Sequence, residues 1–92
     1  MATVIIPTPL RKFTNQTKEV NVNALSIREV FDELILKYPE LKINLLDENN
    51  KFRAFINIFV GDNDIRNLKQ EQTLIKQTDV VSIIPAIAGG SF

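Results

Sequence analysis

The 92-residue chain contains neither cysteine nor histidine, and these two absences narrow its chemistry more than any motif does. Without cysteine the protein forms no disulfide bond and performs no thiol catalysis. Without histidine it lacks the usual side chain for proton transfer near neutral pH. Structural zinc sites normally use Cys or His ligands, so we expect no metal site. The carboxylates, lysines and hydroxyl groups that remain are a poor inventory for an enzyme.

The chain also lacks a surplus of charge and a long apolar run. Eleven lysine and arginine residues balance eleven aspartate and glutamate residues, which argues against nonspecific nucleic-acid binding. No apolar stretch approaches the roughly 20 residues of a membrane helix, so we expect no membrane partner. The start, Met1-Ala2-Thr3, has no basic segment and no long apolar stretch like those of a secretion signal, which favours the cytoplasm.

Five short segments carry strand patterns. Some are rich in β-branched residues, one alternates polar and apolar residues, and turn signals or proline separate them. They cover residues 3–6, 18–23, 55–60, 64–66 and 80–84. A polar loop at 11–17 makes a hairpin of the first two segments, and Pro85 marks the exit from the last.

One helix has a clear signature between the second and third strands. Apolar residues recur at spacings of three and four from Ile27 to Tyr38, which gives one buried stripe. Ser26 and Glu29 have the spacing of a capping box, Leu25 and Val30 that of a hydrophobic staple. Pro39 ends the helix, because the residue before a proline avoids helical backbone angles.

The order of these elements predicts an α+β protein of the β-grasp (ubiquitin-like) type. One main helix buries its apolar stripe on a mixed sheet of four to five strands. We expect a β-grasp domain over residues 1–85 and a flexible C-terminal tail over residues 86–92. An extended stretch of five residues after Pro85 spans about 17 Å, enough to enter a cleft of another protein.

The tail contains Gly89 and Gly90, followed by Ser91-Phe92. A glycine pair gives the chain little steric bulk and wide backbone freedom, so the carbonyl carbon of Gly90 can approach a nucleotide or a nucleophile through a narrow channel. Glycine pairs near a chain end are weak evidence alone. The strand and proline that precede this pair favour a functional interpretation.

The sequence resembles the sulfur-carrier family that includes the small subunit of molybdopterin synthase and the thiamin- and cysteine-pathway carriers. The Ile-Pro-Thr start and the Pro-Ala-x-Ala-Gly-Gly end most resemble the cysteine-pathway branch. Three segments carry the likeness. They are 4–11 (VIIPTPLR), 55–66 (FINIFVGDNDIR) and 79–90 (DVVSIIPAIAGG).

The resemblance implies a carrier without a cofactor and without catalysis of its own. An E1-like enzyme would adenylate the Gly90 carboxylate with ATP, and sulfur would displace the nucleotide to give a thiocarboxylate. A sulfur-accepting synthase would then use this sulfur for cysteine, homocysteine, molybdopterin, thiamin or a secondary metabolite.

One departure from the family pattern concerns the last two residues. Simple members stop at the second glycine, whereas here the Gly90 carboxyl is in an amide bond with Ser91. An amide offers no carboxylate for adenylation. We therefore expect cleavage between Gly90 and Ser91 by a metalloprotease of the JAMM type, which clips such extensions in some relatives.

A docking surface for the activating enzyme is expected on the sheet face away from the helix. In the strand at 55–60 the β-branched residues should pack in the core and leave Phe59 outside. In the strand at 80–84 Val81 and Ile83 should pack and leave Ile84 outside. With Ile87 and Ala88 these two outer residues would form an apolar surface that leads to the tail. The alternative is that these residues cover loops or the edge of the core.

Two other functions remain open. The protein would act as a ubiquitin-like modifier if Gly90 were joined to lysines of other proteins. It would act as a plain β-grasp interaction module if the tail had no role. The predicted helix and core do not discriminate among these functions, because they specify only the fold.

Overall fold

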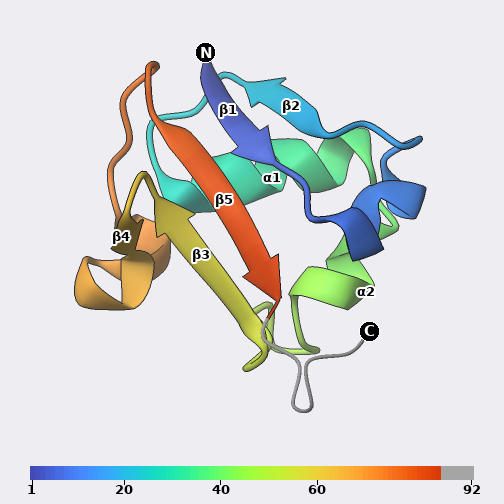
Figure 1. Cartoon of the computed structure of the whole chain (residues 1–92). Coiled ribbons are helices and arrows are strands. Elements are labelled where there is room, and N and C mark those ends of the chain that lie inside the picture. Colours follow the sequence, from blue (N-terminus) through green and yellow to red (C-terminus); the bar gives the residue numbers. More distant parts are fainter. Residues whose placement is uncertain (86–92) are drawn as a thin grey trace.

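A five-stranded mixed sheet, with one long helix across one of its faces, forms the body of the protein (Figure 1). The computed structural model describes residues 1–85, and residues 86–92, the predicted tail, lie outside the described part. The strands are β1 (Ala2–Ile5), β2 (Glu19–Val22), β3 (Ile56–Val60), β4 (Asn63–Asp64) and β5 (Val80–Pro85). They lie in the order β2-β1-β5-β3-β4.

The centre of the sheet is a parallel pair, β1 and β5, and the other neighbouring strands pair antiparallel. β1 and β2 form the predicted hairpin, with Ala2 opposite Val22. The helix α1 (Ile27–Lys37) follows β2 and crosses behind the sheet in Figure 1. A hairpin, a crossing helix and a parallel central pair are the arrangement of the β-grasp fold. The predicted fold class is therefore confirmed.

The short helices lie in the connections between these elements. A short helix after Pro39 is α2 (Leu41–Leu45). Three 3₁₀ helices span Thr8–Phe13, Ile65–Asn67 and Gln70–Gln72.

The start of α1 is fixed by the predicted cap. The Ser26 hydroxyl oxygen accepts from the Glu29 amide at 3.3 Å. The Glu29 carboxylate reaches back to the amide of Leu25, at 3.2 Å, one residue before the cap. The hydrophobic staple was a wrong prediction, because Val30 is buried while the Leu25 side chain is 62% exposed. The hydrogen bonds of Ser26 and Glu29, and not a contact between Leu25 and Val30, therefore fix the start of the helix.

Replacing Ser26 by alanine is expected to lower the free energy of unfolding by about 1 kcal/mol, since an exposed helix amide loses its acceptor. Urea denaturation followed by circular dichroism measures the change. Ser26→Asp restores an acceptor oxygen and serves as the control. Equal denaturation midpoints for Ser26→Ala and the parent protein would show that this cap does not stabilise the fold.

The core lies between α1 and the inner face of the sheet. Alternate residues of each long strand point into it, which gives the alternating burial of β2 and β3. The side chains at its centre are Val4, Val22, Ile27, Val30, Leu34, Ile58, Val81 and Ile83. Each such side chain contributes about 1.5–3 kcal/mol when it is fully buried. The inner face is thus committed to packing, and only the outer face is available to partners.

Two segments differ from the sequence predictions. The short strand expected at 64–66 is confined to β4, because the Asp64 carboxylate accepts from the Arg66 amide at 2.9 Å and starts a 3₁₀ helix instead. The polar loop expected at 11–17 begins as a 3₁₀ helix, Thr8–Phe13. The side chain of Leu10 in this helix is buried, so the connection adds to the core.

Candidate functional site

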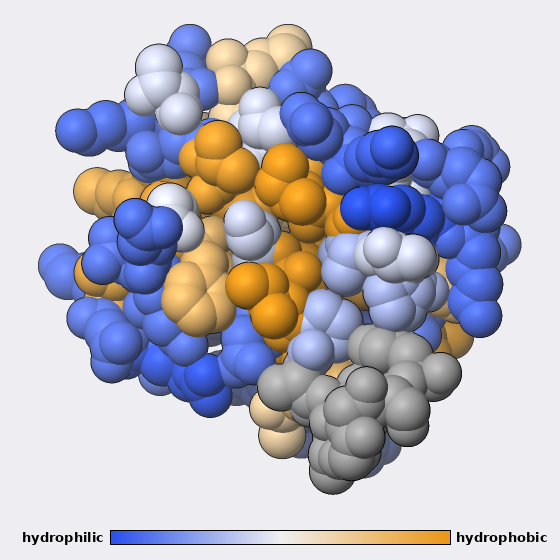
Figure 2. Space-filling model, in the orientation of Figure 1, coloured by the Kyte–Doolittle hydropathy of each residue, from blue (hydrophilic) through white to orange (hydrophobic). Residues whose placement is uncertain are grey.

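The outer face of the sheet is the broadest candidate surface. In the view of Figure 1 α1 lies behind the sheet, and the outer face of β1, β5 and β3 is turned toward the reader. Figure 2 shows an apolar area at the centre of this face, surrounded by polar side chains. Such an apolar centre with a polar rim is typical of protein interfaces.

Four side chains make up this area, which we call the outer-face patch: Ile5, Phe59, Val80 and Ile84. Ile84 is 47% exposed and Val80 is 41% exposed, while Ile5 and Phe59 are half-buried. Ser82 lies at the centre, because its register partners are Ile5 on β1 and Phe59 on β3. The patch therefore crosses three adjacent strands that the backbone holds rigidly.

The patch extends toward the end of β5. Ile84 directly precedes Pro85, the last described residue, and it lies opposite Asn57 on β3. The alternation argument placed Phe59 and Ile84 on the outer face, and the structure has both there. Their role in partner binding remains a prediction. The other predicted site residues, Ile87, Ala88, Gly89, Gly90 and Ser91, lie outside the described residues.

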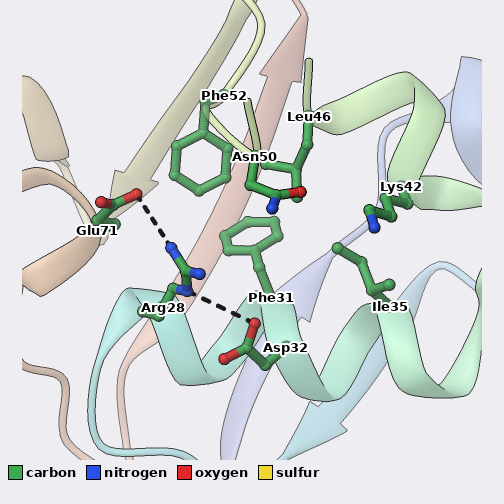
Figure 3. Close-up of a pocket in the computed structure, with 9 residues that line it drawn as sticks. All are labelled: Arg28, Phe31, Asp32, Ile35, Lys42, Leu46, Asn50, Phe52 and Glu71. Atoms are coloured by element: carbon green, nitrogen blue, oxygen red, sulfur yellow. Dashed lines mark ion pairs between the residues drawn. The ribbon is translucent and has the colours of Figure 1, made fainter. Parts of the chain in front are cut away.

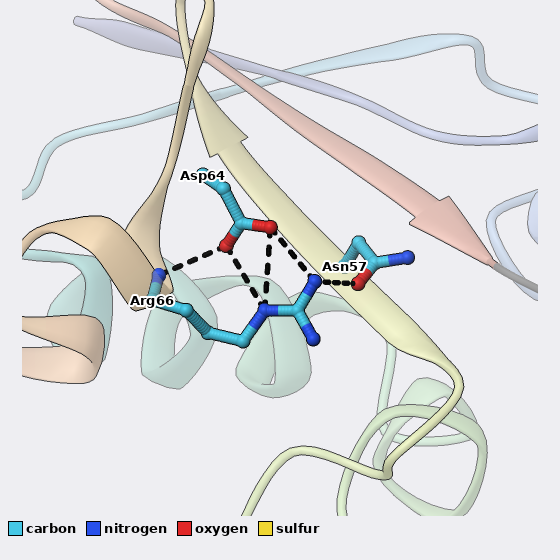
Figure 4. Close-up of polar contacts among 3 residues, drawn as sticks. All are labelled: Asn57, Asp64 and Arg66. Carbon is cyan, nitrogen blue, oxygen red and sulfur yellow. Dashed lines mark hydrogen bonds and ion pairs between the residues drawn. The ribbon is translucent and has the colours of Figure 1, made fainter.

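A polar network borders the patch next to Phe59 (Figure 4). The Nη2 of Arg66 donates to Asp64 Oδ2 at 2.8 Å and to the side-chain oxygen of Asn57, and its Nε lies 3.2 Å from both Asp64 oxygens. Asp64 is the register partner of Phe59. Sequence reasoning did not identify this network as part of a site. The Asp-x-Arg spacing was its only signal.

The network shifts the titration of its members. The Arg66 guanidinium lowers the pKa of the Asp64 carboxyl, first through side-chain hydrogen bonds, then through the backbone amide of Arg66. Asp64 in turn raises the pKa of Arg66. The ionised pair is thus the stable form at neutral pH.

Asp64 is expected to make stability depend on pH in the acid range. A carboxyl whose pKa is lowered in the folded state stabilises the fold above its unfolded pKa, about 3.9. This contribution is lost as the pH falls through the folded-state pKa. Unfolding measured between pH 7 and pH 2 should show a smaller acid loss for Asp64→Asn than for the parent. Asp62→Asn removes the same charge from the turn before β4, and equal slopes for the two variants would contradict the prediction.

A pocket of about 200 Å³ lies on the helix side of the molecule (Figure 3). Its floor includes Phe31 and Phe52, whose rings meet edge to face at 5.0 Å. At its rim Arg28 lies 3.7 Å from both Asp32 and Glu71, and Lys51 lies 3.9 Å from Glu71, so two cations balance two anions. The pocket offers no thiol and no imidazole, and its chemistry supports packing better than catalysis.

The described residues hold no group of three carboxylate side chains arranged to bind a metal ion. Within the same part of the chain, no helix has both the length and the apolar composition needed to cross a membrane.

Comparisons of the sequence and of the structure with known proteins point to the same family. The profile of the ThiS family matches residues 4–90. The chain belongs to the ThiS family. The sulfur carrier protein CysO of Mycobacterium tuberculosis H37Rv is 37% identical over 90 residues, which are 96% of this chain and 97% of CysO.

Solved structures of ThiS-like proteins agree with the fold. A chain of the BexX/CysO complex of Amycolatopsis orientalis has a TM-score of 0.90 and 34% identity, with 98% of this chain and 100% of that chain covered. The small archaeal modifier protein 1 of Methanosarcina acetivorans has a TM-score of 0.83 and 30% identity, with 97% and 95% covered. The protein is therefore a ubiquitin-like sulfur carrier of the CysO/ThiS type, which confirms the resemblance stated above. Proteins of this type are small carriers, not catalysts.

Proposed function

We propose that this ThiS-family protein carries sulfur on the carboxyl group of Gly90. A partner enzyme transfers the adenylyl group of ATP to the Gly90 carboxylate and releases pyrophosphate. A sulfide donor then attacks the acyl carbon, AMP leaves with one carboxylate oxygen, and a thiocarboxylate remains. A sulfur-accepting synthase takes the sulfur for cysteine, homocysteine, molybdopterin, thiamin or a secondary metabolite.

The observation that carries this proposal is the extent of the family match. It spans residues 4–90 and stops at Gly90, the second glycine of the pair. Ser91-Phe92 follows that point. This supports Gly90 as the working end and Ser91-Phe92 as an extension that a JAMM-type metalloprotease removes. The carrier with the extension is then a stored form.

The outer-face patch is proposed as the docking surface for the adenylating enzyme. The patch ends at Ile84, next to the point where β5 leads into the tail. A partner seated on the sheet would therefore lie beside the chain that it must receive. Docking on a rigid sheet would also lower the entropy cost of placing the tail in an active site.

Reconstitution with purified components tests the proposal. The chain shortened to end at Gly90 is incubated with the host's adenylating enzyme, ATP and sulfide. Mass spectrometry should detect the replacement of one oxygen by one sulfur in the intact protein. A chain ending at Gly89 is the control. Consumption of ATP without any change to sulfur at the C-terminus would contradict the proposal.

A modifier function is the second candidate, favoured by the likeness to the small archaeal modifier protein 1. Both functions use the same activated Gly90 carboxyl. They differ in the nucleophile, which is sulfide for a carrier and a lysine amine for a modifier. Isopeptide-linked products in the host would support the modifier function, and thiocarboxylate at Gly90 would support the carrier function.

A further inference from the structure

The Arg66 side chain is held in one orientation and is nevertheless largely open to solvent. Its contacts to Asp64 and Asn57 occupy Nε and Nη2 (Figure 4). Among the described residues no acceptor is hydrogen-bonded to Nη1. The side chain of Arg66 is 61% exposed, against 15% for Asp64, so the cation is the outward member of the pair.

The network places this cation at the border of the outer-face patch. Asp64 is opposite Phe59 in the register, and Asn57 is opposite Ile84. The two acceptors that orient Arg66 are thus the cross-strand neighbours of two patch residues. A partner that covers Phe59 and Ile84 therefore comes close to the guanidinium.

A guanidinium that is already oriented is well suited to recognition. Arginine presents a planar set of donors that matches a carboxylate, and less rotamer entropy is lost when the side chain is ordered before binding. Arginine is also enriched among the residues that contribute most to protein interfaces. Stabilising the turn after β4 needs only Nε and Nη2, so Nη1 remains available for a second role.

We propose that Arg66 recognises a carboxylate side chain on the adenylating partner and so orients that partner on the outer-face patch. This inference rests on the proposed function, because it assumes that the adenylating enzyme binds this face. The partner residue is an aspartate or glutamate at the border of an apolar surface. It accepts from Nη1 while Asp64 and Asn57 keep their contacts.

Binding measurements on three variants test this role. Arg66→Gln removes the charge, Arg66→Lys keeps the charge and loses the fork, and Arg28→Gln removes another exposed, ion-paired arginine on the helix side. The dissociation constant for the host's adenylating enzyme is measured by calorimetry at low and high salt. Arg66→Gln should weaken binding by about 10-fold, since a hydrogen bond to a charged group contributes about 1.5 kcal/mol or more.

The salt dependence separates recognition from a structural role. Binding should depend less on salt for Arg66→Gln, while Arg66→Lys and Arg28→Gln should keep the parent dependence. Equal affinities for Arg66→Gln and the parent would overturn the inference. A loss of salt dependence in Arg66→Lys as large as in Arg66→Gln, or an equal loss of affinity in Arg28→Gln, would overturn it too. Failure of the parent protein itself to bind would instead contradict the proposed function.

Discussion

The chain shortened to end at Gly90 is expected to release pyrophosphate from ATP with its adenylating partner, whereas the 92-residue chain is expected to release none. The reason is chemical. Adenylation of Gly90 needs its carboxylate oxygen as the nucleophile, and in the longer chain the Gly90 carbonyl is in an amide bond with Ser91. The terminal carboxylate of that chain belongs to Phe92, whose bulky side chain does not fit a channel that admits glycine. The effect is therefore a complete loss and not a change of affinity.

Pyrophosphate release is measured with both forms at equal concentration and with saturating ATP. The two forms share residues 1–90, which include the whole outer-face patch, so both should bind the partner with similar affinity. A binding measurement on the longer form serves as the control. Adenylation of the intact 92-residue chain, with Phe92 retained in the product, would contradict the requirement for processing.

Replacing Ile84 by aspartate is expected to weaken binding of the adenylating partner by at least 30-fold. An interface residue that is a hot spot contributes about 2 kcal/mol or more, which corresponds to this factor. The aspartate also carries a charge into a surface that the partner would cover. Because Ile84 is 47% exposed in the free protein, its replacement should change the free energy of unfolding far less than a core substitution would.

Leu74→Asp is the matched control for this prediction. Leu74 is 78% exposed and lies near the N-terminus of α1, where its backbone bridges to Ser26. The variant introduces the same charge in place of an exposed leucine outside the outer-face patch. Calorimetry with the partner and urea denaturation are run on both variants. Similar binding for Ile84→Asp and Leu74→Asp would remove the basis for docking on this face.

The helix and the long strands could be predicted because their signals are local. Ile27 and the following apolar residues repeat with the helical period, and Ser26 and Glu29 mark the start within four positions. Burial alternates along β3 and β5, where Ile56 and Ile58, and likewise Val81 and Ile83, are buried on either side of a less buried residue. The same alternation gave the outward direction of Ile84 without any knowledge of the sheet order.

Other features depend on contacts between distant parts of the chain. The Arg66 side chain binds Asn57, nine positions earlier, and only the pairing of β3 with β4 brings them together. Phe59 is half-buried although it faces outward, because its strand has neighbours on both sides at this position, Ser82 and Asp64. The 3₁₀ helix Thr8–Phe13 depends on burial of Leu10, which a local pattern does not reveal.

The exposure of the Leu25 side chain has a similar explanation. The staple pattern predicted a contact with Val30, but Leu25 instead pairs through its backbone, and its carbonyl accepts from the Ile75 amide at 3.0 Å. Ile75 is buried beside the helix start. A residue from the connection before β5 thus packs at the start of the helix while Leu25 stays largely exposed, and no signal within residues 25–30 indicates this.

Mass spectrometry of the intact protein purified from its host, under conditions of high sulfur demand, tests the central claim most directly. The account predicts chains that end at Gly90, with a fraction in which one oxygen is replaced by sulfur. Treatment with a thiol-alkylating reagent should add one label to that fraction, because the protein has no cysteine. Chains that all retain Ser91-Phe92, or that end at Gly90 with no sulfur and appear only in isopeptide-linked products, would contradict sulfur carriage by this protein.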